Sequence, residues 1–189
     1  SPEGVGISPD GKWVVVAVEE SNSVAFVDTA TNKLTVNLKV KGKNPEHAVF
    51  SPDGKWLYVS AEESDVVDII DARAQKQVAS ITLGQRPRGI GFLPDSSRAY
   101  VAAEEAHMVY SIDTAKQSVL KTIKAGQRAN GVALRPDGKR WVMFTFFGGG
   151  HGGHPHGDGL NHGNTPISTA EIPPLEIFEA AYPIMFRCW

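Results

Sequence analysis

The sequence predicts an all-β fold, a partial β-propeller of about three and a half four-stranded blades. The first observation is a turn sequence, Ser-Pro-Asp-Gly or a variant of it, that occurs four times. Its prolines lie at positions 9, 52, 94 and 136, in steps of 43, 42 and 42 residues. The second observation is that acidic pairs keep this step, at 19–20, 62–63 and 104–105. Four short strands in each such unit are typical of a propeller blade.

The second unit illustrates how one blade is predicted. Pro52, Asp53 and Gly54 form a turn, because proline presets φ and glycine accepts a positive φ. The segments between turns are rich in β-branched and aromatic residues, which favour strands. We expect four strands at 47–50, 56–61, 66–70 and 78–83, with further turns at 62–65 and 72–77.

The repeat also predicts the domain organisation. Blades cover 1–44, 45–86, 87–128 and 129–146, and we expect the last to contain only its first two strands. Phe146-Phe147 and three glycines stand where the next acidic pair should come, so residues 147–189 are predicted to be an irregular Gly/His-rich tail outside the repeat. Within that tail we expect one short helix between 175 and 182, ended by Pro183.

The composition narrows the classes of partner. Hydrophobic residues make up 41% and charged residues 21%, as in soluble globular proteins. The formal net charge of -2 argues against a nucleic-acid partner, which favours a basic surface. No apolar run approaches the roughly 18 residues of a membrane-spanning helix, so we expect no membrane partner. The single cysteine, Cys188, excludes an internal disulfide.

Three segments carry a family resemblance over about residues 1–145. They are Val27-Asp28-Thr29-Ala30-Thr31-Asn32-Lys33, then Asn44-Pro45-Glu46-His47 with the turn that follows it, and Arg86-Pro87-Arg88-Gly89-Ile90. The units resemble YVTN-type β-propeller repeats, and among these the propeller proteins associated with pyrroloquinoline-quinone-dependent alcohol catabolism. The resemblance implies a periplasmic or secreted protein, although no signal peptide is recognisable in this sequence.

The tail resembles a different family. The residues that carry this resemblance are Asn161-His162-Gly163-Asn164-Thr165-Pro166, Glu176, Glu179 and Tyr182-Pro183. The segment 148–189 resembles a C-terminal stretch of the hydantoinase B/oxoprolinase family. This stretch is a small part of a much larger protein, so it implies no activity. Part of a propeller joined to part of an unrelated family indicates a chimeric chain. Such a chain arises at a recombinant or metagenomic junction, or from a frameshifted reading frame. A designed or natural fusion is the alternative.

Polar residues of the repeats are predicted to gather on one face. In a propeller the turns between the second and third strands of each blade (B–C turns) and the loops between blades (D–A loops) lie together around the central channel. The candidate catalytic residues there are Glu19, Glu20, Glu62, Glu63 and His47. The candidate ligand-binding residues are Lys43, Asn44, Glu46, Arg86, Arg88, Glu104, Glu105, Arg128 and Asn130.

The acidic pairs allow two interpretations. Two carboxylates at a suitable separation serve as acid and nucleophile in glycoside hydrolysis, and crowding raises the pKa of one of them. We expect that raised pKa at Glu62 or Glu63, because Arg86 and Arg88 are predicted to keep Glu104 and Glu105 ionised. The alternative is that acidic residues in exposed turns only solvate the rim.

His47 differs from the other blades, which have Gly4, Gly89 and Gly131 at the matching position. A side chain in that place is predicted to reach the channel as ligand or general base, or else to lie on the surface beside a loop.

A second set of histidines lies in the tail. His151, His154, His156, Asp158 and His162 have plausible spacing for a weak site for a divalent transition metal.

These observations lead to two candidate functions. The first is a propeller module that binds a small polar ligand or sugar, or a protein partner, on the face of the B–C turns and D–A loops. The second is a glycosidase-like or lactonase-like hydrolase that uses the acidic pairs of that face, and fold alone does not decide between them. Because a partial ring exposes sheet edges and blade faces, we also expect a homodimer that closes the propeller.

Overall fold

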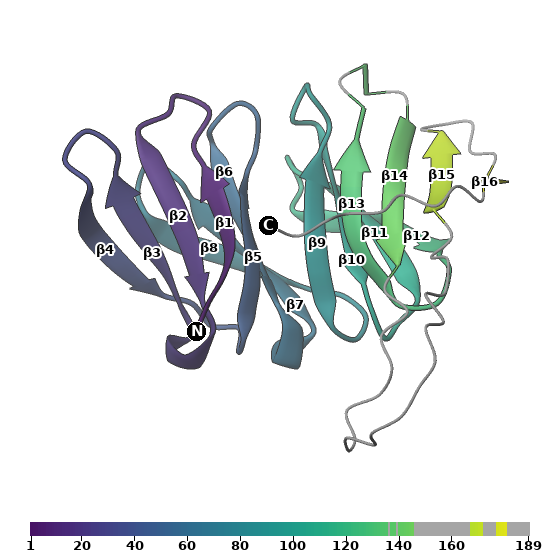
Figure 1. The fold of residues 1–189 in the computed structure, drawn as a ribbon, viewed down its shortest axis with the longest axis horizontal. Coiled ribbons are helices and arrows are strands. Elements are labelled where there is room, and N and C mark those ends of the chain that lie inside the picture. The colour runs from purple at the N-terminus through teal and green to yellow at the C-terminus, as the bar shows by residue number, and fades with distance from the viewer. Residues whose placement is uncertain (136, 139, 146–166, 172–176, 181–189) are drawn as a thin grey trace, which may run out of the picture.

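The computed structural model describes residues 1–135, 137–138, 140–145, 167–171 and 177–180. These residues form four antiparallel sheets of four strands, which stand side by side as successive propeller blades (Figure 1). The predicted all-β propeller fold is therefore confirmed. Within the described ranges, no helix is long and apolar enough to cross a membrane.

The first two sheets have the same organisation, with each strand paired to the next in the chain. The first contains β1 (Pro2–Ile7), β2 (Trp13–Val18), η1 (Glu19–Ser21), β3 (Ser23–Asp28) and β4 (Lys33–Lys39). The second contains β5 (Pro45–Phe50), β6 (Trp56–Ala61), η2 (Glu62–Ser64), β7 (Val66–Asp71) and β8 (Lys76–Thr82). The short 3-10 helices η1 and η2 begin at the acidic pairs, so these pairs occupy the B–C turns as predicted.

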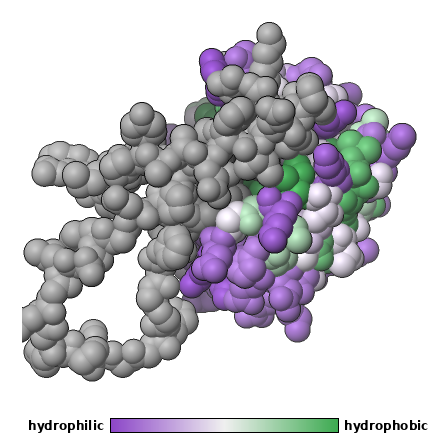
Figure 2. Space-filling model, turned by 90° about the vertical axis from the view of Figure 1, so that its right-hand side faces the viewer, coloured by the Kyte–Doolittle hydropathy of each residue, from purple (hydrophilic) through white to green (hydrophobic). Residues whose placement is uncertain are grey.

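The third and fourth sheets repeat this strand order. The third contains β9 (Pro87–Phe92), β10 (Arg98–Ala103), β11 (Met108–Asp113) and β12 (Ser118–Lys124). The fourth contains β13 (Ala129–Leu134), β14 (Arg140–Thr145), β15 (Ile167–Glu171) and β16 (Ile177–Ala180). Figure 2 views the molecule from the side of the last sheets, where hydrophilic residues surround a smaller group of hydrophobic ones on the described surface.

The fourth sheet corrects two expectations. We predicted two strands there, but β15 and β16 supply the third and fourth from the region assigned to an irregular tail. β16 also occupies the stretch in which we expected a short helix. The physical reason is that β14 has an open edge whose backbone groups need partners, whereas a helix shorter than three turns is marginal alone.

The turns between the first two strands of each blade (A–B turns) show why the repeated motif is needed. In the first blade, the Ser8 hydroxyl donates to the Asp10 carboxylate at 2.7 Å and accepts the backbone N–H of Trp13 at 2.9 Å. Gly11 closes the turn with a φ of 71°, a conformation that glycine adopts without strain. Ser51 and Asp53 make the same bond in the second blade at 2.6 Å.

Three apolar clusters fill the seams between neighbouring sheets. Phe26 and Leu57 are fully buried in the first seam, Tyr58 and Ile112 in the second, and Ala102 in the third. Glycines let the inner strands approach each other at the first and third seams. A Cβ at Gly4 would lie 2.5 Å from the Glu46 carbonyl oxygen, and one at Gly89 would lie 2.6 Å from Cα of Gly131.

Candidate functional site

A β-bulge at the start of each inner strand positions the candidate site. The pairing between β5 and β6 shifts between Pro45 and His47, and the pairing of β9 and β13 with their neighbours shifts at the matching place. Bulges redirect side chains, and they are frequent beside functional sites. Here the bulged segments contain Glu46 and Arg88, so both side chains reach across the seam between the second and third sheets.

The D–A loops are held by a hydrogen bond that repeats at each seam. Each bond joins a backbone N–H at the loop's end to a side-chain acceptor in the preceding blade's B–C turn. Both residues of each pair have positive φ values between 46° and 57°. The three bonds are Asn44 N to Asn22 Oδ1 (2.9 Å), Arg86 N to Asp65 Oδ1 (3.0 Å) and Arg128 N to His107 Nδ1 (3.0 Å).

Arg88 lies at the centre of a buried group of ion pairs. Its guanidinium contacts Glu46 at 2.5 Å and Glu62 at 2.9 Å, and it also contacts Glu104. Its side chain is only 18% exposed, and that of Glu104 is 1% exposed. Three carboxylates from two blades therefore share one half-buried cation.

Two further arginines complete this group, which we call the ion-pair cluster: Glu46, Glu62, Glu104, Arg86, Arg88 and Arg128. Arg86 contacts Glu62 in the second blade and Glu105 in the third, the latter at 3.1 Å. Arg128 contacts Glu104 through Nε at 2.7 Å and through Nη2. Arginine is suited to such sites because its planar guanidinium presents several donors to carboxylates. The six residues carry three positive and three negative charges.

The electrostatics of Glu104 exclude it as an acid at neutral pH. Burial alone would raise its pKa, but the hydrogen bond from Arg128 and the charges of Arg88, Arg128 and Arg86 lower it below its ordinary value of 4.5. The structure also corrects the contrast that we expected between the pairs. Arg86 and Arg88 contact Glu62 as well as the third blade, so Glu62 is no freer of cations than Glu104.

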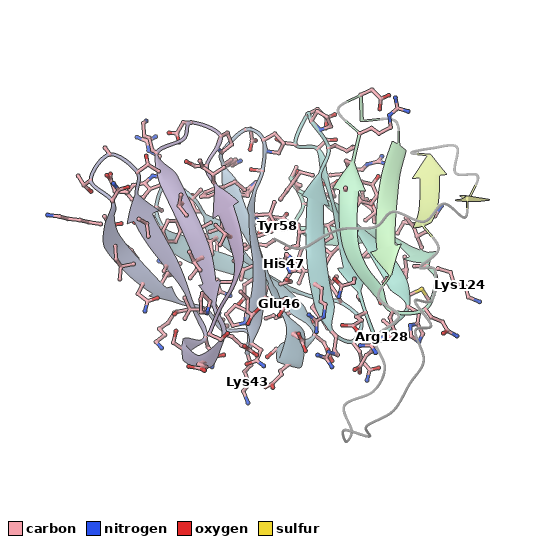
Figure 3. All side chains as sticks on the ribbon, in the orientation of Figure 1. Lys43, Glu46, His47, Tyr58, Lys124 and Arg128 are labelled. Carbon is pink, nitrogen blue, oxygen red and sulfur yellow. The ribbon has the colours of Figure 1, made fainter. Side chains whose placement is uncertain are left out.

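His47, a residue of β5, lies beside the ion-pair cluster, with Glu46 and Tyr58 on either side of it in Figure 3. Its backbone N–H donates to the Ser60 hydroxyl at 3.1 Å. Its Nδ1 is buried and has no hydrogen-bond partner in the described part of the chain. Burial lowers the pKa of its imidazole below 6.5, an effect that the charge of Glu46 opposes and that of Arg88 reinforces. His47 is therefore neutral at neutral pH.

Tyr58 is a functional candidate that sequence reasoning missed. The side chain is fully buried, its hydroxyl has no partner within the described residues, and its ring packs edge-on against Phe92 at 4.9 Å. Burial and the charge of Asp113 raise its pKa, so it stays a neutral donor and acceptor. Tyr58 pairs with Val49, two residues beyond His47 on the same face of the sheet, so both unpaired atoms belong to the same seam.

The remaining predicted residues lie at the margin of the cluster. Asn44 donates from Nδ2 to Glu63 at 3.0 Å, and Glu20 contacts the amino group of Ser1 at 3.3 Å. Among the described residues no arginine forms an ion pair with Glu19, and Asn44 occupies the position that Arg86 and Arg128 hold at the other seams. Lys43 is exposed, and Asn130 is half-buried on the bulge of β13. The predicted metal ligands His151, His154, His156, Asp158 and His162 lie outside the described residues.

The sequence contains a signal for the ion-pair cluster that we did not use. Arg86 lies 24 residues after Glu62, and Arg128 lies 24 residues after Glu104. An arginine and a glutamate that recur at one separation in successive repeats must meet in the same way at successive seams. This regularity predicts ion pairs rather than free carboxylates.

Comparisons with known proteins place the chain in a family. Residues 87–189, more than half of the chain, match the family described as Hydantoinase B/oxoprolinase. The chain belongs to the hydantoinase B/oxoprolinase family. The hydantoinase B/oxoprolinase match confirms the resemblance of the tail. The matched region is longer than the tail, because it begins at β9 in the third sheet, which has the same sequence repeat as the first two sheets. Residues 2–78 match another family, described as Lactonase, 7-bladed beta-propeller.

Solved structures confirm the propeller architecture for this hydantoinase B/oxoprolinase family chain. A chain of Kuenenia stuttgartiensis hydrazine synthase is 28% identical, with a TM-score of 0.81 over 95% of this chain and 49% of that one. A functionally unknown protein from Desulfotomaculum acetoxidans is 14% identical, with a TM-score of 0.75 over 98% of this chain and 58% of that one. The RRP9 WD40 repeats are 14% identical, with a TM-score of 0.76 over 95% of this chain and 50% of that one. The chain spans about half the length of these structures, and among curated proteins none matches it.

Proposed function

We propose that the protein is a propeller module that binds a small, neutral, polar ligand, of which a sugar is the best example, at the mouth of the seam between the second and third sheets. The site consists of His47, the ion-pair cluster beside it and the D–A loops around them. The observation that carries this proposal is the pairing of the inner carboxylates. Glu46, Glu62 and Glu104 all contact arginine, so none is available as a free acid or nucleophile.

The charge balance of the cluster indicates the ligand class. Three glutamates and three arginines leave no net charge to select an ion. Guanidinium groups offer donors and carboxylates offer acceptors, which is the combination that hydroxyl groups of a sugar satisfy. The buried Nδ1 of His47 has no partner within the described residues, and it adds an acceptor or a donor according to the tautomer of the neutral imidazole.

The experiment uses a substitution that the repeat already contains. His47→Gly installs the residue found at Gly4, Gly89 and Gly131, so the inner strand should still form. Calorimetric titration with neutral mono- and disaccharides should give binding that falls at least about tenfold in His47→Gly. His107→Asn, at an exposed turn of the next seam, is the matched control and should bind as the unchanged protein does. Equal affinity in His47→Gly, or no binding of any sugar at millimolar concentration, would overturn the proposal.

A lactonase-like hydrolase is the second candidate, because residues 2–78 match the lactonase propeller family. A neutral His47 is the group best able to act as general base, since its lowered pKa leaves the imidazole unprotonated at neutral pH. Hydrolysis of a panel of lactones at neutral pH distinguishes the two functions. Turnover that disappears in His47→Gly but survives in a Glu62→Gln, Glu63→Gln double variant would favour the hydrolase with His47 as its base.

A further inference from the structure

A groove of about 530 Å³ lies between the first and second sheets. It is formed by the A–B turns of both sheets and the turn between β7 and β8, at the edge opposite to the ion-pair cluster (upper edge in Figure 1). Its lining includes Trp13, Phe50, Asp53, Gly54 and Arg73. Because antiparallel strands separate the two edges, this groove is distinct from the site proposed above.

The groove contains one cation that is not used elsewhere in the described structure. Arg73 is exposed, and its guanidinium makes no hydrogen bond or ion pair with the described residues. The neighbouring acidic groups are already engaged. Asp10 accepts from Ser8 and from the backbone and side chain of Lys12, and Oδ1 of Asp53 accepts from Ser51 and from the backbone of Lys55. Arg73 is therefore the group left to bind an anion.

Trp13 supplies a flat apolar surface in the same groove. Its ring packs edge-on against Phe26 with centroids 6.3 Å apart, and it remains partly exposed. At the second seam the equivalent Trp56 is covered by a cation, since Nζ of Lys55 lies 4.8 Å from the ring centroid. In the first blade the corresponding lysine, Lys12, turns instead to Asp10 at 3.1 Å.

The second seam serves as an internal comparison. There Ser96 bridges the two turns, because its hydroxyl accepts the backbone N–H of Asp53 at 2.9 Å. Gly54 holds the position of Ser96 at the first seam and has no side chain to form this bridge. Ala115 holds the position of Arg73 at the second seam, and Ala30 holds it in the first blade. The first seam therefore has a glycine, Gly54, in place of the bridging serine. It also has a cation, Arg73, where the first and third blades have alanine.

We propose that this groove binds a small organic anion that carries a carboxylate on a six-membered ring, such as an aromatic acid or a uronic acid. The guanidinium of Arg73 receives the carboxylate, and the indole of Trp13 packs against the ring. The missing bridge at Gly54 leaves room for the ligand between the turns.

Benzoate and glucuronate are the probes, with uncharged benzamide and neutral glucose for comparison, and each pair is compared in the His47→Gly background so that the sugar site does not contribute. Binding is followed by calorimetry and by the chemical shift of the Trp13 indole N–H, assigned with Trp13→Phe. Arg73→Ala copies Ala30 and Ala115, and we expect it to weaken binding of the anions at least about tenfold. Gly54→Ser copies Ser96, which has a φ of 60° at the same turn position, and it should also weaken binding by closing the groove.

The repeat also allows the site to be transplanted. The triple variant Lys55→Ala, Ser96→Gly, Ala115→Arg, which also uncovers Trp56, should gain a second anion site at the next seam and so raise the binding stoichiometry from one to about two. Unchanged anion affinity in Arg73→Ala, or equal binding of the charged and uncharged members of each pair, would overturn the proposal. Failure of both anions to bind the unchanged protein would also overturn it. The sugar site is tested by His47→Gly and is unaffected by these variants, so the two proposals fail separately.

Discussion

The guanidinium of Arg88 on β9 lies 2.5 Å from the Glu46 carboxylate on β5, and this pair joins the second blade to the third. The same guanidinium contacts Glu62 and Glu104. Glu104 is buried, and Glu46 and Glu62 are half-buried. Removal of the Arg88 cation leaves Glu46 without an arginine partner in the described structure, and Glu62 and Glu104 keep only Arg86 and Arg128, respectively.

We therefore expect Arg88→Leu to lower the free energy of unfolding by about 3–5 kcal/mol. Arg86→Leu is the matched control, because Arg86 is about twice as exposed and surface ion pairs contribute about 1 kcal/mol or less. Urea unfolding followed by circular dichroism measures both changes. Similar small losses for the two variants would show that Arg88 is not the centre of the cluster.

Glu104 should make unfolding depend on pH in the acid range. Its pKa in the folded protein is below 4.5, so its ionised form stabilises the fold above that pH, and this contribution is lost as the pH falls through the lowered pKa. Glu104→Gln removes the contribution. The difference in stability between the unchanged protein and Glu104→Gln should be greatest near neutral pH and should shrink below about pH 4.5. A difference that is constant with pH would contradict this account.

Protonation of His47 should destabilise the fold, whereas protonation of a histidine paired with a carboxylate stabilises it. Burial lowers its pKa below 6.5, so protons bind more weakly to the folded than to the unfolded state. Stability is therefore lost as the pH falls below 6.5. In His47→Gly the decline in thermal midpoint between about pH 7 and pH 5 should be smaller than in the unchanged protein. An identical decline would show that His47 is not the titrating group.

His107 should hold one interblade hydrogen bond that protects a loop amide. Its Nδ1 accepts the backbone N–H of Arg128 at 3.0 Å. At the other seams Asn22 and Asp65 accept the equivalent bond. Hydrogen exchange at the Arg128 amide, corrected for the intrinsic rate, should accelerate in His107→Ala, which removes the acceptor, but not in His107→Asn, which copies Asn22. Unchanged exchange in His107→Ala would contradict this prediction.

The homodimer that closes the propeller stays a prediction. The outer face of the first sheet exposes large apolar side chains, with Val5 at 66% and Ile7 at 62% exposure. Exposed apolar faces favour association, so we expect sedimentation velocity to show a dimer that Val5→Asp and Ile7→Asp convert to monomer. Thr35→Asp, on an exposed outer strand, is the control. A folded monomer of 20.4 kDa at micromolar concentration would contradict the prediction.

The repeat itself determined the fold of the first three blades. Turn residues at a constant step fix the strand boundaries, because proline, aspartate and glycine act locally on the backbone. For this reason β6 was predicted with its observed bounds, 56–61, and the acidic pairs were correctly placed in the turns that follow the second strands. The same local information failed for β15 and β16, since their partner is an open strand edge rather than a sequence neighbour.

Only the tertiary structure decided which polar residues meet. The sequence predicted that Glu46, Glu62, Arg86 and Arg88 lie on one face of the propeller. It did not predict that they form ion pairs with one another. The structure pairs them, because bulges on β5 and β9 direct their side chains across the seam. The groove beside Arg73 depends in the same way on Gly54 and Asp10 from different blades. Local propensity determines each blade, whereas the approach of one blade to the next determines which charges find partners and which remain available to a ligand.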